Sequence, residues 1–183
     1  GTLVLITNFR VPGYPQPDRP SRGGLVTGLL TGDDPQSAEI APFNPFNLIL
    51  ASGDKGLTFI SNYPEEQRRR LPDGIHGLSN GHLAPPWPKT ERLNAALSDW
   101  LASPSPSPAD LFAPLRNETR RETGLDGPLP QLSGIFINDP VYGTRCSTVI
   151  AVDAEGQGTM TERSFDSNGA ASGEASLTFR WPV

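Results

Sequence analysis

The sequence predicts an α+β fold in which hairpin-paired antiparallel strands form sheets that helices cover. Three observations favour this class. Two segments rich in strand-forming residues, 46–52 and 57–63, flank a short loop with the turn chemistry of a hairpin. Apolar residues recur with helical spacing after Pro88, and the last third of the chain alternates strand-like segments with turn residues. A chain of 183 residues suits one domain, which we expect to span 1–183.

The N-terminal third begins with a strand and continues into a helix. "TLVLITNF" (2–9) is apolar on both faces, which predicts a strand deep inside a sheet. A domain seldom opens in this way, so we expect its N-terminal part to be missing. Ser21 is suited to cap a short helix that carries Leu25 and Leu29. Further along, "GIHGLSN" (74–80) predicts a brief strand that ends in a polar turn.

The most regular helical pattern starts at Pro88, a residue that the first turn of a helix tolerates. Apolar side chains then recur on one face, at Leu93, Ala96, Leu97, Trp100 and Leu101. The Ser-Pro repeat 103–108 cannot be helical, because proline lacks an amide hydrogen and fixes φ. We expect a stiff connector within the domain, with a phosphorylatable linker as the alternative, and a further short helix over 110–116.

The final third predicts a sheet. The segments "STVIAVD" (147–153), "TMTERSF" (159–165) and "ASLTFRW" (175–181) are strand-like, and turn residues separate them. In the last segment apolar and polar residues alternate strictly, so that one face is apolar.

Composition excludes several classes of function. Fifteen Lys and Arg stand against 20 Asp and Glu, a net charge of -5, and the one arginine run, 68–70, lies beside two glutamates. We interpret this run as a solvated loop and expect no nucleic-acid partner. A single cysteine rules out an internal disulfide and favours a reducing compartment. No apolar run approaches the roughly 20 residues that span a bilayer, so we expect no integral membrane segment.

Polar residues adjoin apolar strands at three places. They are Thr7-Asn8, Ser79-Asn80 and the segment 142–145, which contains Tyr142 and Arg145. An asparagine NH₂ can donate to developing negative charge, and an arginine can hold a carboxylate or phosphate. The structural alternative is that asparagine tolerates turns and arginine pairs on the surface. Spacing alone leaves both interpretations open.

Cys146 directly follows Arg145 at the start of a predicted strand. Adjacent residues of a strand point to opposite faces, so the guanidinium is poorly placed to activate the thiol. We predict a packed or incidental thiol that is not a nucleophile. His76 and His82 are six residues apart, unlike the i, i+4 pair of a helical zinc site, and we predict no metal site.

Several segments resemble, in order, the successive motifs of one family. They are "ITNFR", "SRGGLVTGLL", "FNLILAS", "HGLSNGHLAPPWPK", "YGTRCSTVIAVDAEG" and "MTERSF". The family is the transport and Golgi organization protein 2 family, also called NRDE after an N-terminal Asn-Arg-Asp-Glu motif. The resemblance implies an N-terminal nucleophile (Ntn) hydrolase-like fold, an αββα sandwich of two antiparallel sheets between helix layers. This sequence would be its middle and C-terminal portion, without the N-terminal cysteine and the Asn-Arg-Asp-Glu segment.

The resemblance also implies roles for particular residues. In related hydrolases a terminal cysteine attacks an amide with its own amino group as base, and two asparagines form the oxyanion site. Asn8 and Asn80 are similar to those asparagines, and Arg145 is similar to a later arginine of the cleft. Trp87 and Tyr142 are weaker candidates for lining a ligand cleft. For Trp87 the alternative is that it anchors the following helix.

Two functions are compatible with this resemblance. The first is an intracellular factor in secretion and Golgi organisation that handles a small hydrophobic or anionic metabolite, such as haem or an acyl-CoA. Its location would be cytoplasmic, with the mitochondrion or the Golgi as alternatives. The second is a cysteine amidohydrolase whose nucleophile lies upstream of this chain. For these 183 residues alone we predict no catalysis, because Gly1 precedes Thr2 and carries no nucleophile. The sequence does not indicate whether the protein forms oligomers.

Overall fold

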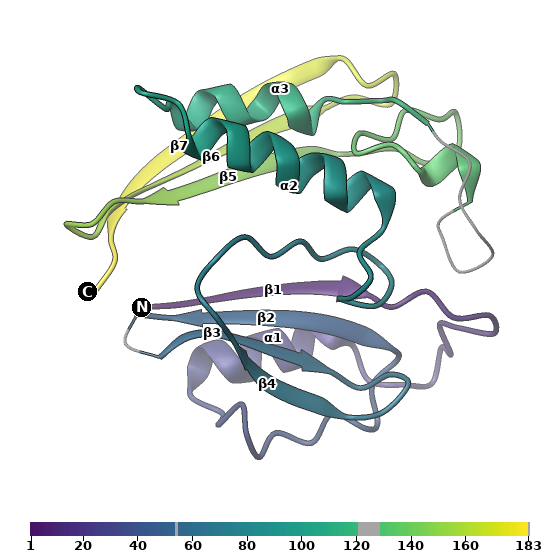
Figure 1. Ribbon diagram of the computed structural model, residues 1–183. Coiled ribbons are helices and arrows are strands. Elements are labelled where there is room, and N and C mark those ends of the chain that lie inside the picture. The colour runs from purple at the N-terminus through teal and green to yellow at the C-terminus, as the bar shows by residue number, and fades with distance from the viewer. Residues whose placement is uncertain (54, 121–128, 183) are drawn as a thin grey trace. The chain divides into compact units, whose positions relative to one another are not determined.

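The computed structural model describes residues 1–53, 55–120 and 129–182. These residues form two antiparallel sheets and several helices, a mixed α and β architecture that confirms the coarse fold class (Figure 1). The chain divides into two compact units. The first unit comprises Gly1–Gly74 and Leu78–Pro85, and the second comprises Ile75–Gly77 and Pro86–Val183. That the whole of 1–183 forms one domain stays a prediction.

The sheet of the first unit contains, among the described residues, four strands in the order β1-β2-β3-β4. Their bounds are Thr2–Asn8, Phe46–Ser52, Gly56–Ser61 and Gln67–Leu71. The hairpin predicted from the sequence joins β2 to β3, with Ser52 opposite Gly56. Gly56 has φ +68°, in the left-handed region that glycine adopts without strain, which explains a glycine at this turn.

One face of this sheet packs against the helix α1 (Arg22–Thr31), which lies along it in Figure 1. Strand residues of even number point to this face because side chains alternate along a strand. They form a core with two residues of α1, and the buried members are Leu25, Leu29, Ile40, Phe46, Leu48, Leu50 and Ile60. Ser21 caps α1 as predicted, its Oγ accepting from the Gly23 N–H at 3.2 Å.

The opposite face carries a second, smaller core. Ile49, Phe59 and Leu71 are buried there, and Leu78 and Leu83 pack against them. The same alternation places polar side chains of odd number on this face, above all Asn47, Ser61 and Arg69. The sheet therefore separates two different environments.

Three sequence predictions for the first 80 residues are wrong. The opening strand was expected deep inside a sheet, but β1 pairs only with β2 among the described strands, and Leu5 is 49% exposed. The arginine run 68–70 is part of β4 and pairs with β3, so it is not a loop. The segment 74–80 contains no strand. Its carbonyls at Ser79 and Asn80 accept hydrogen bonds from a side chain and from a loop amide, and not from a neighbouring strand.

The second unit contains, within the described ranges, a sheet in the order β5-β6-β7. Its strands are Cys146–Val152, Gln157–Phe165 and Ala171–Arg180, which confirms the sheet predicted for the final third. The helix α2 (Pro88–Leu101) begins at the predicted proline, and the 3-10 helix η1 (Pro108–Leu111) with α3 (Phe112–Leu115) confirms the short helix expected over 110–116. A further 3-10 turn, η2, covers Pro130–Leu132. In Figure 1, α2 and α3 lie along one face of this sheet.

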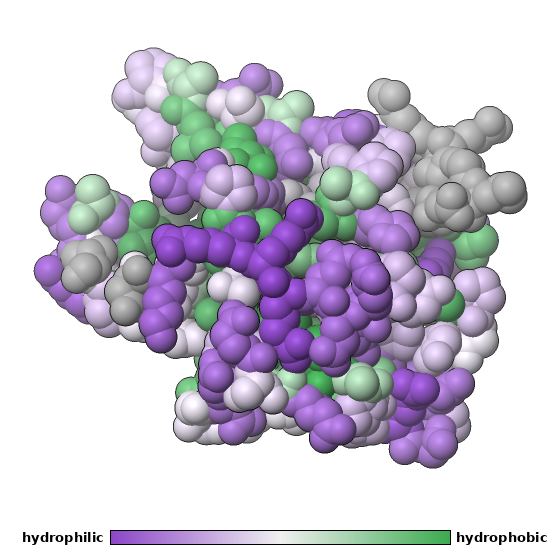
Figure 2. All heavy atoms as spheres, turned by 60° about the horizontal axis from the view of Figure 1, so that its bottom comes forward, coloured by the Kyte–Doolittle hydropathy of each residue, from purple (hydrophilic) through white to green (hydrophobic). Residues whose placement is uncertain are grey.

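The surface agrees with the polar composition of the chain. The face shown in Figure 2 is mostly hydrophilic, and apolar residues reach it in small separate groups. Of the helices in the described ranges, none combines the length and the apolar character that crossing a membrane requires.

Candidate functional site

A clamp of hydrogen bonds fixes the segment 79–81 against the ends of β1 and β2. Thr7 donates through Oγ1 to the Ser79 carbonyl at 2.8 Å, and Asn47 donates through Nδ2 to the Gly81 carbonyl at 2.6 Å. Thr7 and Asn47 are cross-strand partners, so both reach the segment from the same face of the sheet. The clamp explains why this irregular segment has a fixed position without belonging to the sheet.

The same clamp brings Asn8 and Asn80 together, although 72 residues separate them. The Nδ2 of Asn80 donates to the main-chain carbonyl of Asn8 at 2.9 Å, and the Arg10 N–H donates to the Asn80 carbonyl at 2.7 Å. The contact therefore joins one side chain to the other residue's backbone. Within the described residues, the second N–H of Asn80 and the Nδ2 of Asn8 make no hydrogen bond, so both remain available as donors.

Arg22, the first residue of α1, completes the site on the helix side of the sheet. Asn8 lies opposite Phe46 in the β1–β2 register, so its side chain points toward α1, and its Oδ1 accepts a hydrogen bond from the Arg22 guanidinium. Burial lowers the pKa of Arg22. The Nε of Arg22 is buried and has no partner within the part of the chain that the structure describes. The α1 face of the site thus holds a partly desolvated cation beside one amide donor, the Nδ2 of Asn8.

A hollow of about 460 Å³ opens beside Arg22. It is lined by residues 15–17, 19–23 and Asn44, and therefore by three prolines and two arginines. Asn44 shapes it by holding Gln16 from both sides, with its Oδ1 accepting from the Gln16 N–H at 2.8 Å and its Nδ2 donating to the Gln16 carbonyl at 2.9 Å. Proline rings offer an apolar wall and the guanidinium offers a charge, a combination that suits an amphiphilic anion.

Arg145, Tyr142 and Trp87 belong to the second unit. Arg145 precedes β5 and is exposed, and it lines a small hollow of about 70 Å³ together with Tyr142, which is 65% exposed. Trp87 precedes α2, with the Lys89 ammonium 5.5 Å from the centre of its ring. That these three residues share a cleft with Asn8 and Asn80 stays a prediction.

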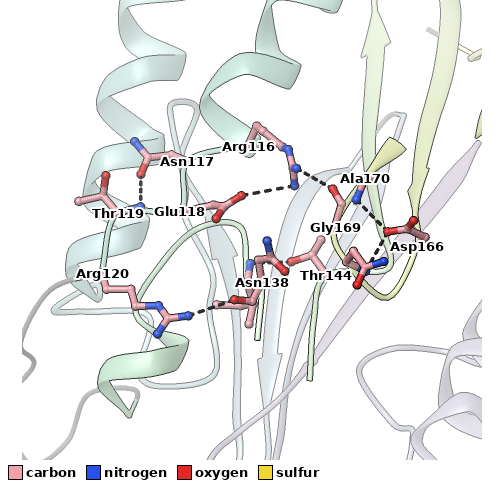
Figure 3. Close-up of polar contacts among 12 residues, drawn as sticks. Arg116, Asn117, Glu118, Thr119, Arg120, Asn138, Thr144, Asp166, Gly169 and Ala170 are labelled. Atoms are coloured by element: carbon pink, nitrogen blue, oxygen red, sulfur yellow. Dashed lines mark hydrogen bonds and ion pairs between the residues drawn. The ribbon is translucent and has the colours of Figure 1, made fainter. Parts of the chain in front are cut away.

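The loop that carries Tyr142 and Arg145 is braced by a network of polar contacts (Figure 3). Arg116 lies 3.8 Å from the ring centre of Phe136 and donates to the Gly169 carbonyl at 2.6 Å. At the base of the loop, the Ile137 N–H donates to the Thr144 Oγ1 at 2.9 Å, and the Thr144 N–H donates to the Ile137 carbonyl at 2.8 Å. These contacts fix the backbone next to Arg145 and leave its side chain exposed.

Cys146 does not have the environment of a nucleophile. It is exposed on β5, so of the two expectations, a packed or an incidental thiol, the packed thiol is wrong. Partial burial of the sulfur and the nearby Glu162 carboxylate raise the pKa of the thiol. The described residues also contain no group of three or more His, Cys, Asp or Glu side chains that could hold a metal ion.

Comparison with known proteins identifies the family. Residues 1–167 match the family described as Transport and Golgi organisation 2. The chain belongs to this family. The chain is 35% identical, over 192 residues, to the Transport and Golgi organization protein 2 homolog of Bos taurus, with 90% of this chain and 69% of the relative covered. The homologs of Homo sapiens and Mus musculus are 34% and 31% identical with the same coverage. The resemblance drawn from the sequence is therefore confirmed.

Two residues that make contacts at the candidate site of this family member, Arg22 and Asn47, were not predicted from the sequence. Arg22 lies in the "SRGG" segment that carried the resemblance to the transport and Golgi organization 2 family. Its position directly after the N-cap Ser21 is the signal that could have identified it. Asn47 lies inside the apolar run of β2, and a polar amide within such a run is itself a signal.

Proposed function

We propose that this member of the transport and Golgi organization 2 family binds a small anionic or hydrophobic metabolite, with haem and acyl-CoA as the candidate ligands. The proposal includes a role in secretion and Golgi organisation, and the names of the relatives, which refer to transport and Golgi organization, support the second of these. It also includes an intracellular location, in the cytoplasm, the mitochondrion or at the Golgi. The finer fold, an Ntn hydrolase-like αββα sandwich, is part of the proposal and is supported by the two antiparallel sheets.

The observation that carries the proposal is the contact between Arg22 and Asn8 next to an open hollow. The guanidinium has one hydrogen bond to Asn8 and a buried Nε without a partner in the described chain, so its positive charge is incompletely compensated. Arg22 also lies at the N-terminus of α1, where the helix dipole favours a negative group. A carboxylate or phosphate bound there would satisfy both.

Native mass spectrometry of the full-length protein with haem or acyl-CoA tests the proposal. We expect the wild type to retain one of them and the Arg22→Gln variant to release it. Arg10→Gln is the matched control, because Arg10 follows β1, the strand that carries Asn8, and its side chain has no partner in the described residues. If neither ligand nor a co-purified metabolite is retained, or if both variants behave alike, the proposal fails.

An amidohydrolase is the second candidate, and the free N–H groups of Asn8 and Asn80 favour it, since amides of this kind stabilise an oxyanion. Cys146 is unsuited as its nucleophile, so the nucleophile would come from sequence upstream of Gly1. In that case Asn80→Ala would lower kcat of the full-length protein by about 10²- to 10³-fold. Reading the upstream coding sequence for a cysteine after the initiator methionine distinguishes the two candidates. Hydrolysis by the 183 residues alone, above an Asn80→Ala control, would contradict the prediction that they lack catalysis.

A further inference from the structure

A second hollow, of about 220 Å³, lies on the face of the β1–β4 sheet that is opposite to α1. Its lining includes four ring-bearing residues, one buried amide and one guanidinium, namely Phe9, Phe59, Tyr63, His82, Asn47 and Arg69. We propose that this hollow is a binding site for a small planar aromatic carboxylate that carries an O–H or N–H donor.

The buried amide of Asn47 is the reason to expect an O–H or N–H donor on the ligand. Its side chain is only 1% exposed, and its Nδ2 donates to the Gly81 carbonyl at 2.6 Å. That bond orients the amide so that Oδ1 is a buried acceptor, and this oxygen has no partner in the portion of the chain that the structure describes. Buried acceptors without a partner are rare in folded proteins. A donor group on a ligand in the hollow would satisfy it.

The rings supply the preference for a flat ligand. Phe9 packs against both Tyr63 and His82, with ring centres 5.0 Å apart in both pairs and interplanar angles of 56° and 83°. Phe59 adds a further ring to the lining. Tilted and edge-on arrangements of this kind present ring edges and faces against which another aromatic ring packs well.

Arg69 supplies the preference for a carboxylate. Its guanidinium lies 5.5 Å from the ring centre of Phe59, its partner across the β3–β4 pair, and it forms no hydrogen bond or ion pair within the described residues. Arg68, on the other face of β4, is by contrast bound to Glu66 at 2.9 Å and to the Ala38 carbonyl at 2.6 Å. An arginine held over a ring with its N–H groups unused suits bidentate recognition of a carboxylate.

This hollow is separate from the site beside Arg22. Asn8 pairs with Phe46, and both side chains point to the α1 face. Asn47 is the next residue of β2 after Phe46, so its side chain points to the opposite face. The inference therefore goes beyond the proposed function, and either can fail without the other.

Three probes of similar size test the inference on the full-length protein by NMR titration. 4-Hydroxybenzoate has the ring, the donor and the carboxylate; benzoate lacks the donor; and 4-hydroxybenzyl alcohol lacks the charge. We expect 4-hydroxybenzoate to bind with a dissociation constant on the order of 1 mM, as for a fragment, and to shift the amide signals around Asn47 and His82. The other two probes should bind about tenfold more weakly.

Paired variants separate the proposed contact from a general charge effect. Arg69→Gln should weaken 4-hydroxybenzoate about tenfold and leave 4-hydroxybenzyl alcohol unchanged. Arg70→Gln, the next residue of the same strand on the opposite face, should change neither. Arg22→Gln, which removes the charge from the first site, should also leave probe binding unchanged.

Four outcomes would overturn the inference. They are equal affinity for the three probes, no binding of any probe, equal effects of Arg69→Gln and Arg70→Gln, and a high-resolution map that contains only water at the Asn47 oxygen after soaking with 4-hydroxybenzoate.

Discussion

Replacing Arg22 by glutamine should leave the first unit as stable as the wild type, or more stable by up to about 1 kcal/mol, while it abolishes anion binding. We expect opposite signs because the protein compensates the charge of Arg22 poorly, which costs stability but would favour a bound anion. Its positive charge lies at the N-terminus of α1, where the helix dipole disfavours a cation, and its Nε is buried without a partner in the described residues.

The magnitude follows from three contributions. Removing the charge from the first turn of α1 gains about 0.3 to 1 kcal/mol. Removing the unpaired Nε gains about 1 kcal/mol, the low end of the range for an unsatisfied buried group, because Arg22 is only partly buried. Replacing a charged hydrogen bond to Asn8 by a neutral one from glutamine loses about 1 to 1.5 kcal/mol. These contributions nearly cancel, with a small net gain.

Urea denaturation followed by far-UV circular dichroism, together with native-state hydrogen exchange of β2 and β3 amides, would measure the change. Tryptophan fluorescence would not, because the three tryptophans of the chain, at 87, 100 and 181, all belong to the second unit. With a slope of about 2 kcal/mol per molar urea, the midpoint of the first unit should rise by no more than about 0.5 M.

Arg22→Ala is the matched comparison, since it removes the hydrogen bond to Asn8 altogether and should be less stable than Arg22→Gln. A loss of more than about 1 kcal/mol in Arg22→Gln, equal to the loss in Arg22→Ala, would refute the reasoning and make Arg22 a structural residue.

Two further predictions concern the second unit. A Cβ added at Gly158 would enter the ring of Phe179, so Gly158→Ala should lower the free energy of unfolding by about 1 to 3 kcal/mol. A Cβ added at Gly173 would have nothing within 4 Å, so Gly173→Ala should leave that free energy unchanged or raise it by up to about 1 kcal/mol. Equal denaturation midpoints of the two variants, followed by tryptophan fluorescence, would contradict this. Partial burial and the Glu162 carboxylate raise the pKa of Cys146 and so lower its thiolate fraction near pH 8. Glu162→Gln removes the second cause, so it should speed alkylation of Cys146 by iodoacetamide, as followed by peptide mass mapping. An unchanged rate would contradict a contribution of the carboxylate.

The sequence identified elements where local chemistry and tertiary contacts agree. Pro88 starts α2 because proline is tolerated only in a first turn, and Ser21 caps α1 because its hydroxyl satisfies a free N–H. Both signals depend only on neighbouring residues, so they can be recognised without knowledge of the fold. The sheet of the last third was also predictable, since turn residues separate its strand-like segments and the last segment alternates apolar and polar residues.

The errors arose where tertiary pairing overrides local composition. The run 68–70 has low strand propensity, yet it pairs with β3 because Leu71 enters the core beside Phe59 and Arg68 finds carbonyl acceptors. The segment 74–80 has a strand-like pattern, yet its carbonyls bond to β1 side chains and loop amides. In both cases a hydrogen-bond partner lies far away in sequence, 33 residues from Arg68 and 72 residues from Ser79, beyond the reach of any local pattern.

The candidate site was predictable only in part for the same reason. Asn8 and Asn80 were found through resemblance, and the structure brings them within hydrogen-bonding distance. Arg22 was not found, because its contact with Asn8 depends on α1 packing against β1. The face of the sheet on which Asn47 lies could not be assigned either, since the register of β2 decides it.

The geometry around Asn8 favours binding over catalysis. A hydrolase needs donors that interact more strongly with the transition state than with the bound substrate. Asn80 instead uses one N–H to hold the Asn8 carbonyl, and Arg22 carries a permanent charge that would stabilise a ligand anion in its ground state. Interactions that stabilise the bound ligand as much as the transition state increase affinity but do not accelerate the reaction. The arrangement of these residues therefore supports the proposed binding of an anion more than the amidohydrolase.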